Sequence, residues 1–434
     1  MNLTDDQKKL LIHTILITLL LVVPKLLGLL GINQSPSITI RYFLSHSLFE
    51  PIFLPFAFIG SFLIYIHFYP NLPNRLAVVW IVLVAGCLYI PFSDGQDLLI
   101  KIIAYASLMG IAACVLSIIW MLNSHNSEIL VNAQQLLIVI TIPVFIILAY
   151  YLMPLTVNLH LTSYDNILYL FDDTLGPQIS FSIGRLFEKL PILGIICKVI
   201  YLSLPLGITY IFIMHQRQRH PSSVNILFLF ISLGLVGFFL YNLVPAAGPI
   251  FRFGKAFPYA PPQASLIPII PMSLETGPRN AMPSLHVAWA LAMWWNSYNL
   301  GKLARLIIAS FLSLTLLAVL GTGQHYFVDI VVAFPFALTL QAIFTKSATN
   351  LKDLRGISII FGGSMTVMWL YVLHYYYIPY FKAHTAISWI LVVVTIITSE
   401  VLAQYIVRSA FATNAYNGSK ETIFLNTSTE CQLK

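Results

Sequence analysis

Charged residues are scarce in this chain. Aspartate, glutamate, lysine and arginine make up 9% of its 434 residues, whereas 58% are hydrophobic and the mean hydropathy is +0.84. Soluble domains carry about 25% charged residues, so the composition excludes an ordinary soluble protein. No stretch alternates polar and apolar residues as a membrane barrel does, and helices satisfy their own backbone groups in lipid. The expected fold class is an all-α polytopic membrane protein.

Cysteine is also rare, with four residues in the chain. Cys87, Cys114 and Cys197 lie in apolar runs and Cys431 lies near the C-terminus, so no spacing typical of a disulfide framework or a metal site is present. The formal net charge is +7. We attribute this excess to cytoplasmic loops and expect no nucleic-acid partner.

Most of the chain consists of long apolar runs. A helix that crosses a membrane needs about 20 apolar residues. We expect about twelve spans, at residues 10–30, 52–68, 76–93, 97–121, 135–153, 190–214, 224–245, 285–298, 303–320, 326–345, 357–377 and 387–407. The run at 285–298 is short, which indicates a helix that begins below the membrane surface or extends upstream.

The orientation follows from lysine and arginine, which favour the cytoplasmic side. Lys8 and Lys9 precede the run 10–30, which is too long for a signal-peptide core and is interpreted as a retained first helix. Placing the N-terminus inside puts most basic residues in inside segments. We therefore expect a protein of the plasma (inner) membrane with both termini in the cytoplasm.

One pair of polar residues opens the run 326–345. His325 and Asp329 are four residues apart, which places them on one helix face about 6 Å apart along the axis. A carboxylate there can accept a proton from one imidazole nitrogen and leave the other as a base or nucleophile. An ionisable residue inside a span is by default a functional hypothesis.

A second polar group opens the run 285–298. His286 begins this helix, and Ser284 lies beside a helix N-terminus that suits an anion. Both helices begin on the outside face in the expected topology, so the two histidines meet one surface. This combination suits phosphoryl transfer, with three outside cations to bind the phosphate: Arg252, Lys255 and Arg279.

Two outside segments, 154–189 and 246–284, are long enough to be structured. The first contains "TSYDNILYLFDDTLG", which mixes aromatic residues and carboxylates as interfacial helices do. We interpret Asp165, Asp172 and Asp173 as residues that cap or solvate this helix, outside the candidate site.

These motifs resemble those of the type 2 phosphatidic acid phosphatase superfamily. That family has a Pro-Ser-Gly-His motif and a later His-x-x-x-Asp motif, which stand here as "PSLH" (283–286) and "HYFVD" (325–329). Three details resemble the inositol phosphorylceramide synthase branch and its bacterial relatives. They are the leucine in place of glycine, the residues "HYFVD", and the segment "VPAAGP" (244–249).

The resemblance covers about residues 135 to 346 and implies a catalytic core of six helices. Residues 1–134 would add four N-terminal helices, and 347–434 two C-terminal helices and a cytoplasmic tail. It implies that His325 forms a phosphohistidine, that Asp329 orients it, and that His286 protonates the leaving alcohol. It further implies a reaction without metal or other cofactor.

The chain departs from the family pattern where phosphate-binding cations are expected. No Arg-Pro dipeptide is present, Ala318 and Val319 replace a Ser-Arg pair, and Ala333 replaces a glycine. Arg252, Lys255 and Arg279 are the candidates to replace the missing cations. The synthase branch tolerates this loss, which favours that branch.

Three functions remain open from the sequence. The leading one is a membrane phosphotransferase or phosphatase that acts on a lipid phosphate ester at the extracytoplasmic face, and a lipid alcohol as acceptor would make it a transferase. Water as acceptor would make the chain a lipid phosphate phosphatase, acting on phosphatidate or polyprenyl phosphate. A proton-coupled transporter is the third, because Lys25, Lys101 and Lys198 lie within spans.

Overall fold

The computed structural model describes residues 53–70, 80, 98–124, 128–218, 224–274, 277–346 and 352–431. About 78% of these residues are helical, which agrees with an all-α membrane protein. Within these ranges five helices are long and apolar enough to cross a membrane, or six if α9 and α10 form one span. The count of twelve stays a prediction, because the runs 10–30 and 76–93 lie outside the described residues, apart from residue 80.

The chain folds as two compact units, of which the first comprises residues 1–155 and 202–213. Its described helices are α3 (Leu54–Phe68), α5 (Leu98–Leu122), most of α6 (Ile129–Leu159) and most of α10 (Leu204–Gln216). A Cβ atom on Gly110 would lie 1.9 Å from the carbonyl oxygen of Phe58, so α3 and α5 approach each other as only small residues allow. The three-part division expected from the sequence stays a prediction.

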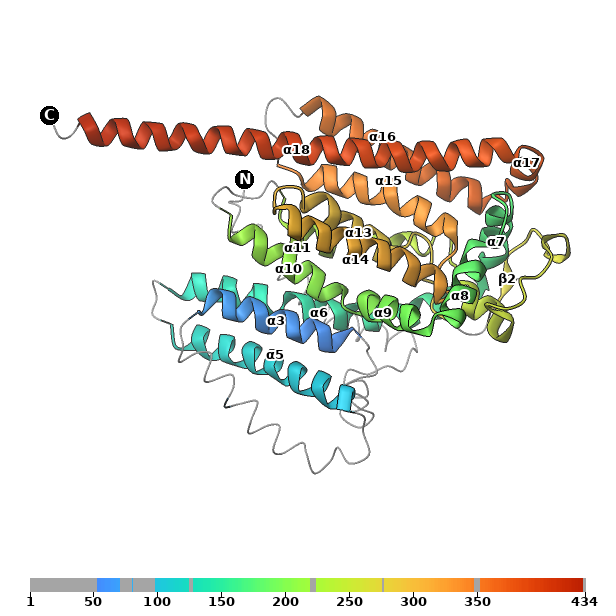
Figure 1. Ribbon diagram of the computed structural model, residues 1–434, viewed down its shortest axis with the longest axis horizontal. Coiled ribbons are helices and arrows are strands. Elements are labelled where there is room, and N and C mark those ends of the chain that lie inside the picture. Colours follow the sequence, from blue (N-terminus) through green and yellow to red (C-terminus); the bar gives the residue numbers. More distant parts are fainter. Residues whose placement is uncertain are drawn as a thin grey trace. The chain divides into compact units, whose positions relative to one another are not determined.

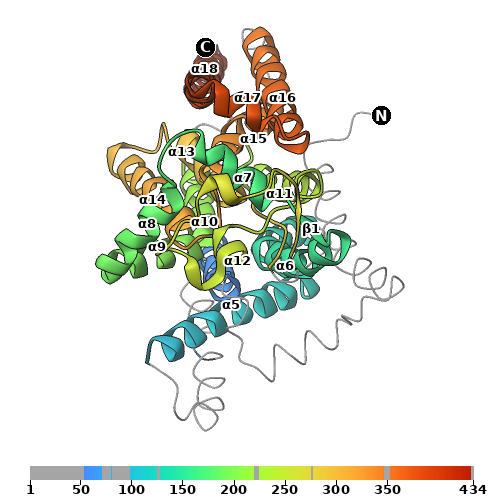
Figure 2. The ribbon, with the colours of Figure 1, turned by 90° about the vertical axis from the view of Figure 1, so that its right-hand side faces the viewer.

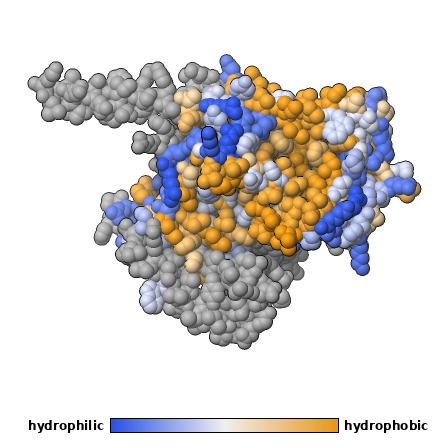
Figure 3. All heavy atoms as spheres, in the orientation of Figure 1, coloured by the Kyte–Doolittle hydropathy of each residue, from blue (hydrophilic) through white to orange (hydrophobic). Residues whose placement is uncertain are grey.

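The second unit comprises residues 156–201 and 214–434. Within it α15 is the central helix: 78% of its most apolar window is buried, against 41% or less for the other candidate spans. Apolar side chains gather across the middle of the face in Figure 3, with hydrophilic ones toward both ends. The helices of this unit, shown in Figure 1, are α7 (Asp165–Asp173), α8 (Ile179–Lys189), α9 (Pro191–Leu202), α11 (Ile226–Leu240), α13 (Leu285–Asn296), α14 (Lys302–Gly321), α15 (Phe327–Phe344), α16 (Lys352–His374), α17 (Ile378–Ala383) and α18 (Thr385–Cys431).

Two helix boundaries differ from the apolar runs. The run 190–214 is divided at Ser203 into α9 and α10. The run 285–298 forms a helix of 12 residues that does not extend upstream, and at 1.5 Å per residue it is about 18 Å long, too short to cross a membrane of about 30 Å. Where this short helix lies relative to the membrane surface stays a prediction.

The segment 246–284 has little regular structure and lies at the end of the unit that faces the viewer in Figure 2. It contains α12 (Pro249–Phe253), two short 3-10 turns, η2 (Gly254–Ala256) and η3 (Ala264–Leu266), and β2 (Met272–Ser273), which pairs antiparallel with β1 (Thr162–Ser163). Gly248 has a φ of +103°, and a Cβ there would lie 2.3 Å from the carbonyl oxygen of Gln324. This glycine lets the segment touch the turn before α15.

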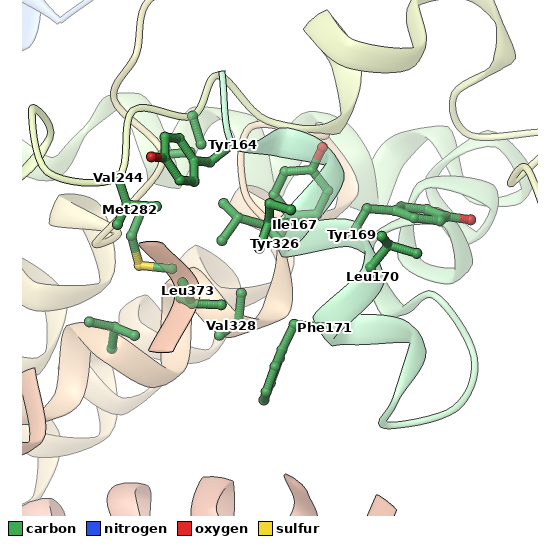
Figure 4. Packing of buried hydrophobic residues seen from close by; sticks show 14 of the residues in the cluster. Tyr164, Ile167, Tyr169, Leu170, Phe171, Val244, Met282, Tyr326, Val328 and Leu373 are labelled. Atoms are coloured by element: carbon green, nitrogen blue, oxygen red, sulfur yellow. The ribbon is translucent and has the colours of Figure 1, made fainter. Parts of the chain in front are cut away.

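Helix α7 contributes Ile167, Leu168, Tyr169, Leu170 and Phe171 to an apolar cluster of buried residues (Figure 4). Eight of its nine residues are buried. The ring of Phe171 meets those of Trp369 and Phe381 edge-on, at centroid distances of 5.2 and 5.4 Å. The composition of this helix predicts an interfacial position, but the structure buries it, because its polar residues form hydrogen bonds inside the protein.

Candidate active site

His325 lies in the turn between α14 and α15. Its imidazole is buried, and Nδ1 lies 2.9 Å from the carbonyl oxygen of Ala281 and 3.4 Å from Oδ2 of Asp329. A carbonyl oxygen can only accept a hydrogen bond, so the proton sits on Nδ1. The geometry therefore leaves Nε2 with its lone pair, as a nucleophile or base.

Asp329 is fully buried in the first turn of α15. Its Oδ2 accepts the N–H of Tyr326 at 2.8 Å, and its main-chain oxygen accepts the N–H of Ser284 at 3.1 Å. Its Oδ1 has no hydrogen-bond partner. The main-chain bond joins the starts of α13 and α15, so the "PSLH" and "HYFVD" segments lie together.

Ser284 occupies the position before α13, where a serine side chain usually caps the helix. Here it makes no such bond, and its buried Oγ has no partner. A buried polar atom without a partner costs about 1–3 kcal/mol. Two unpaired oxygens, Ser284 Oγ and Asp329 Oδ1, thus lie on the two joined helix starts, and a substrate group could satisfy them.

His286 lies in the first turn of α13. Its ring stacks on Tyr201 at a centroid distance of 3.9 Å and meets Trp289 edge-on at 5.8 Å. It is close enough to His325 for the charges of the two rings to interact. The structure therefore brings both histidines to one place, with the orientation of His286 fixed by aromatic rings.

Burial decides the protonation of His325. Desolvation lowers the pKa of its imidazole to about 4, and the hydrogen bond to Ala281 offsets only part of that shift. The ring is therefore neutral at pH 7, as a nucleophilic imidazole must be.

Two carboxylates that sequence reasoning left out of the site support it. Asp165 accepts hydrogen bonds from Ser163 Oγ, from the N–H groups of Ala247 and Gly248 at 2.9 and 2.7 Å, and from Tyr326 Oη at 3.0 Å. It therefore ties the "VPAAGP" segment to the residue next to His325. Burial raises the pKa of Asp165, and these hydrogen bonds oppose the shift.

Asp172 accepts the N–H groups of Phe327 and Val328 at 2.6 and 3.0 Å, and so caps α15 from α7. Burial raises its pKa well above the usual value, and the nearby charge of Asp329 adds to the shift. The two acids are seven residues apart and thus share a helix face, whereas Asp173 does not. This spacing of seven residues is the feature of the sequence that could have predicted a shared role for Asp165 and Asp172.

The motif residues lie within the part of the chain that resembles a known family. Residues 166–343 match the PAP2 superfamily. Members of this superfamily are phosphatases or phosphotransferases that act on phosphate esters, and an enzyme of that broad type is what the match supports. The matched residues are less than half of the chain. No curated protein and no solved structure shows significant similarity to it.

Within the PAP2 match, Arg279 is the most restrained of the three candidate cations. Its buried guanidinium donates to the carbonyl oxygens of His160 at 3.2 Å, Gly277 at 2.6 Å and Leu274, and its N–H donates to Thr156 Oγ1 at 2.9 Å. It therefore holds the segment 246–284 in place. Its role as a phosphate ligand stays a prediction.

The other two cations differ in burial. Arg252 donates from Nε to Asn166 Oδ1 at 2.9 Å, lies over the ring of Phe253 at 5.0 Å, and is close enough to Tyr326 for their charges to interact. Lys255 is exposed on η2. Arg252 thus interacts with the residue that follows His325, and its role as a phosphate ligand also stays a prediction.

Proposed function

We propose that the chain is a membrane enzyme that transfers or hydrolyses a lipid phosphate ester through a phosphohistidine on His325. The observation that carries the proposal is the Nδ1–H of His325 held by the Ala281 carbonyl, which leaves Nε2 free to attack. The match of residues 166–343 to the PAP2 superfamily supports the same reaction class.

In the first step, Nε2 of His325 attacks phosphorus and the bond from phosphorus to the leaving alcohol breaks. His286, which must carry a proton once the anionic phosphate is bound, gives that proton to the departing oxygen. The imidazole gains positive charge as the N–P bond forms. Its Nδ1–H stays between the Ala281 carbonyl and Asp329 Oδ2, and the carboxylate offsets that charge.

In the second step, a hydroxyl attacks phosphorus and the N–P bond breaks. His286, now neutral, takes the proton of that hydroxyl, so both rings return to their starting states. A lipid hydroxyl gives transfer and water gives hydrolysis. The phosphate oxygens would bind at Ser284 Oγ and the N-terminus of α13, with Arg252, Lys255 and Arg279 as the candidate cations.

We favour transfer of the inositol phosphorylceramide synthase type, supported by the "PSLH", "HYFVD" and "VPAAGP" segments. The site would face the outside of the plasma (inner) membrane. The alternative is a lipid phosphate phosphatase acting on phosphatidate or polyprenyl phosphate. Both use the same first step and differ in the acceptor.

The test uses the purified full-length chain in detergent with a phosphate-labelled phospholipid and a long-chain lipid alcohol. We expect label on a new lipid, and after rapid quenching a labelled protein whose bond is stable to alkali and labile to acid. His325→Ala should lose both. His384→Ala, an exposed histidine before α18, is the matched control and should keep both.

Release of free phosphate in place of a new lipid would establish the phosphatase alternative. Turnover in His325→Ala equal to that of the wild type would overturn the proposal.

A further inference from the structure

The end of α13 opposite to the histidines carries a second group of charged and aromatic side chains. The guanidinium groups of Arg305 on α14 and Arg408 on α18 both lie over the ring of Tyr298, at 5.1 and 4.8 Å from its centroid. Two like charges on one ring repel each other. Among the described residues, neither arginine forms an ion pair that would relieve this repulsion.

Glu400 on α18 lies near this end of α13, and the hydrogen bonds of its carboxylate come from neutral donors. It accepts hydrogen bonds from Trp294 Nε1 at 2.8 Å, Trp295 Nε1 at 2.7 Å and Gln404 Nε2 at 3.0 Å. Its carboxylate fixes the two indoles. The positive charge of the arginine pair is therefore left for an external anion.

A pocket of about 310 Å³ adjoins the arginine pair, between α13, α14, α15 and α18. Its walls are mostly apolar, with Leu291, Leu312 and Ile396 among them, and Ser313 and Glu400 are its polar residues. Trp294 connects the pocket with the arginine pair. It lines the pocket, and the guanidinium of Arg305 lies over its ring, 4.7 Å from the centroid. The volume is in the range of ligand sites.

The surface around the pocket belongs to the apolar face of the unit. Leu306 and Ile307 on α14 and Val393 and Ile397 on α18 are exposed hydrophobic residues. A surface of this kind faces lipid tails. A soluble anion would find the arginines but would leave the pocket empty, whereas a phospholipid fills both.

We propose that Arg305, Arg408, Tyr298 and this pocket form a binding site for an anionic phospholipid. The two guanidinium groups bind the phosphate of its headgroup, and one acyl chain enters the pocket. Trp294 is eight residues from His286 along α13, about 12 Å of helix rise. The site is thus separate from the candidate active site, at the membrane surface that the expected topology assigns to the cytoplasmic leaflet, which is rich in anionic lipid.

The experiment measures thermal unfolding and native mass spectra of the purified full-length chain with added phosphatidylglycerol. Phosphatidylcholine and glycerol 3-phosphate are added in parallel samples. We expect phosphatidylglycerol alone to raise the Tm and to remain bound, less so at high salt. Each charge-assisted contact should contribute about tenfold in affinity.

The variants distinguish the contribution of the arginine charges from that of the apolar pocket. Arg305→Gln with Arg408→Gln should abolish the Tm rise, Arg305→Lys with Arg408→Lys should keep part of it, and Ala309→Trp should abolish it by filling the pocket. Lys302→Gln, which removes an exposed cation one turn from Arg305, is the control and should keep it.

The proposal is overturned if phosphatidylcholine raises the Tm equally, or if the double glutamine variant folds and still retains phosphatidylglycerol. An equal effect of glycerol 3-phosphate would overturn the lipid part and leave an anion site. None of these readouts depends on turnover, so they are independent of the function proposed for His325.

Discussion

At the scale of single residues, the imidazole of His325 is oriented by a backbone carbonyl as well as by a carboxylate. Nδ1 lies closer to the oxygen of Ala281 than to Oδ2 of Asp329. The tautomer that leaves Nε2 free is therefore fixed by the main chain at the end of the segment 246–284. Any change that moves this segment would alter the orientation of the His325 ring without replacing the residue itself.

The low pKa of His325 predicts the acidic limb of the pH profile. Its imidazole has a pKa lowered to about 4, below the ordinary value of about 6.5, so the neutral form persists until the pH falls through about 4. We expect kcat/KM to decline with a midpoint near pH 4, since this parameter reports the free enzyme. Helix content measured across the same range controls for unfolding, and a midpoint near 6.5 with the fold intact would contradict the prediction.

The role of His286 predicts a dependence on the leaving group. An alcohol leaves poorly without a proton, so His286→Ala should slow turnover of a lipid ester by about 10²–10⁴-fold. Nitrophenyl phosphate needs no such proton, and the same variant should accumulate labelled protein because the second step lacks its base. If the variant slowed both substrates equally and trapped no label, His286 would act through structure alone.

Some of the candidate site residues could be predicted from the sequence and others could not. His325 and Asp329 could be paired from their spacing, and His286 and Ser284 from a helix start on the same face. Ala281 acts through its main-chain carbonyl oxygen. Its side chain therefore gives no sign in the sequence that it contacts His325. The spacing of Asp165 and Asp172 was visible, but that both are buried became clear only with the structure.

At the scale of secondary structure, the start of α15 depends on α7. Its first two N–H groups donate to Asp172, a residue 155 positions earlier in the chain. The turn that carries His325 is thus fixed by a helix outside both motif segments.

This contact predicts a loss of stability in Asp172→Ala. Two buried N–H groups would lose their acceptor, which costs about 2 kcal/mol, or about 5 °C in Tm for a unit of this size. Turnover should fall as well, because the turn with His325 loosens. Asp173→Ala, one residue away and less buried, is the matched control. Equal Tm values for the two variants would show that the cap contributes nothing.

Most helices could be placed from hydropathy alone, because the runs are long and bounded by polar residues. The division at Ser203 and the end of α13 at Asn296 could not, since both follow from packing and not from a change in composition. The segment 246–284 could be predicted to be structured, but its path depends on contacts with Asp165 and on the buried Arg279.

At the scale of the whole molecule, the expected topology places the segments before and after α13 on opposite sides of the membrane. Lys255 lies in the segment that leads to α13, and Lys302 follows its end. The bias of basic residues toward the cytoplasm puts Lys255 outside and Lys302 inside.

Cysteine labelling tests this orientation. In a variant whose four cysteines are replaced by serine, Lys255→Cys should react with an impermeant maleimide on intact cells. Lys302→Cys should react only after the cells are made permeable. The reverse pattern would place the candidate active site on the cytoplasmic side.

The cap of α15 by Asp172 also has a consequence for how the protein is made. Asp172 is synthesised 155 residues before Phe327. Its carboxylate therefore has no N–H partner from α15 while the intervening chain is being made. Helix α7 thus gains its full set of native contacts only after α15, α16 and α17 have all been made, because Phe171 also packs on Trp369 and Phe381.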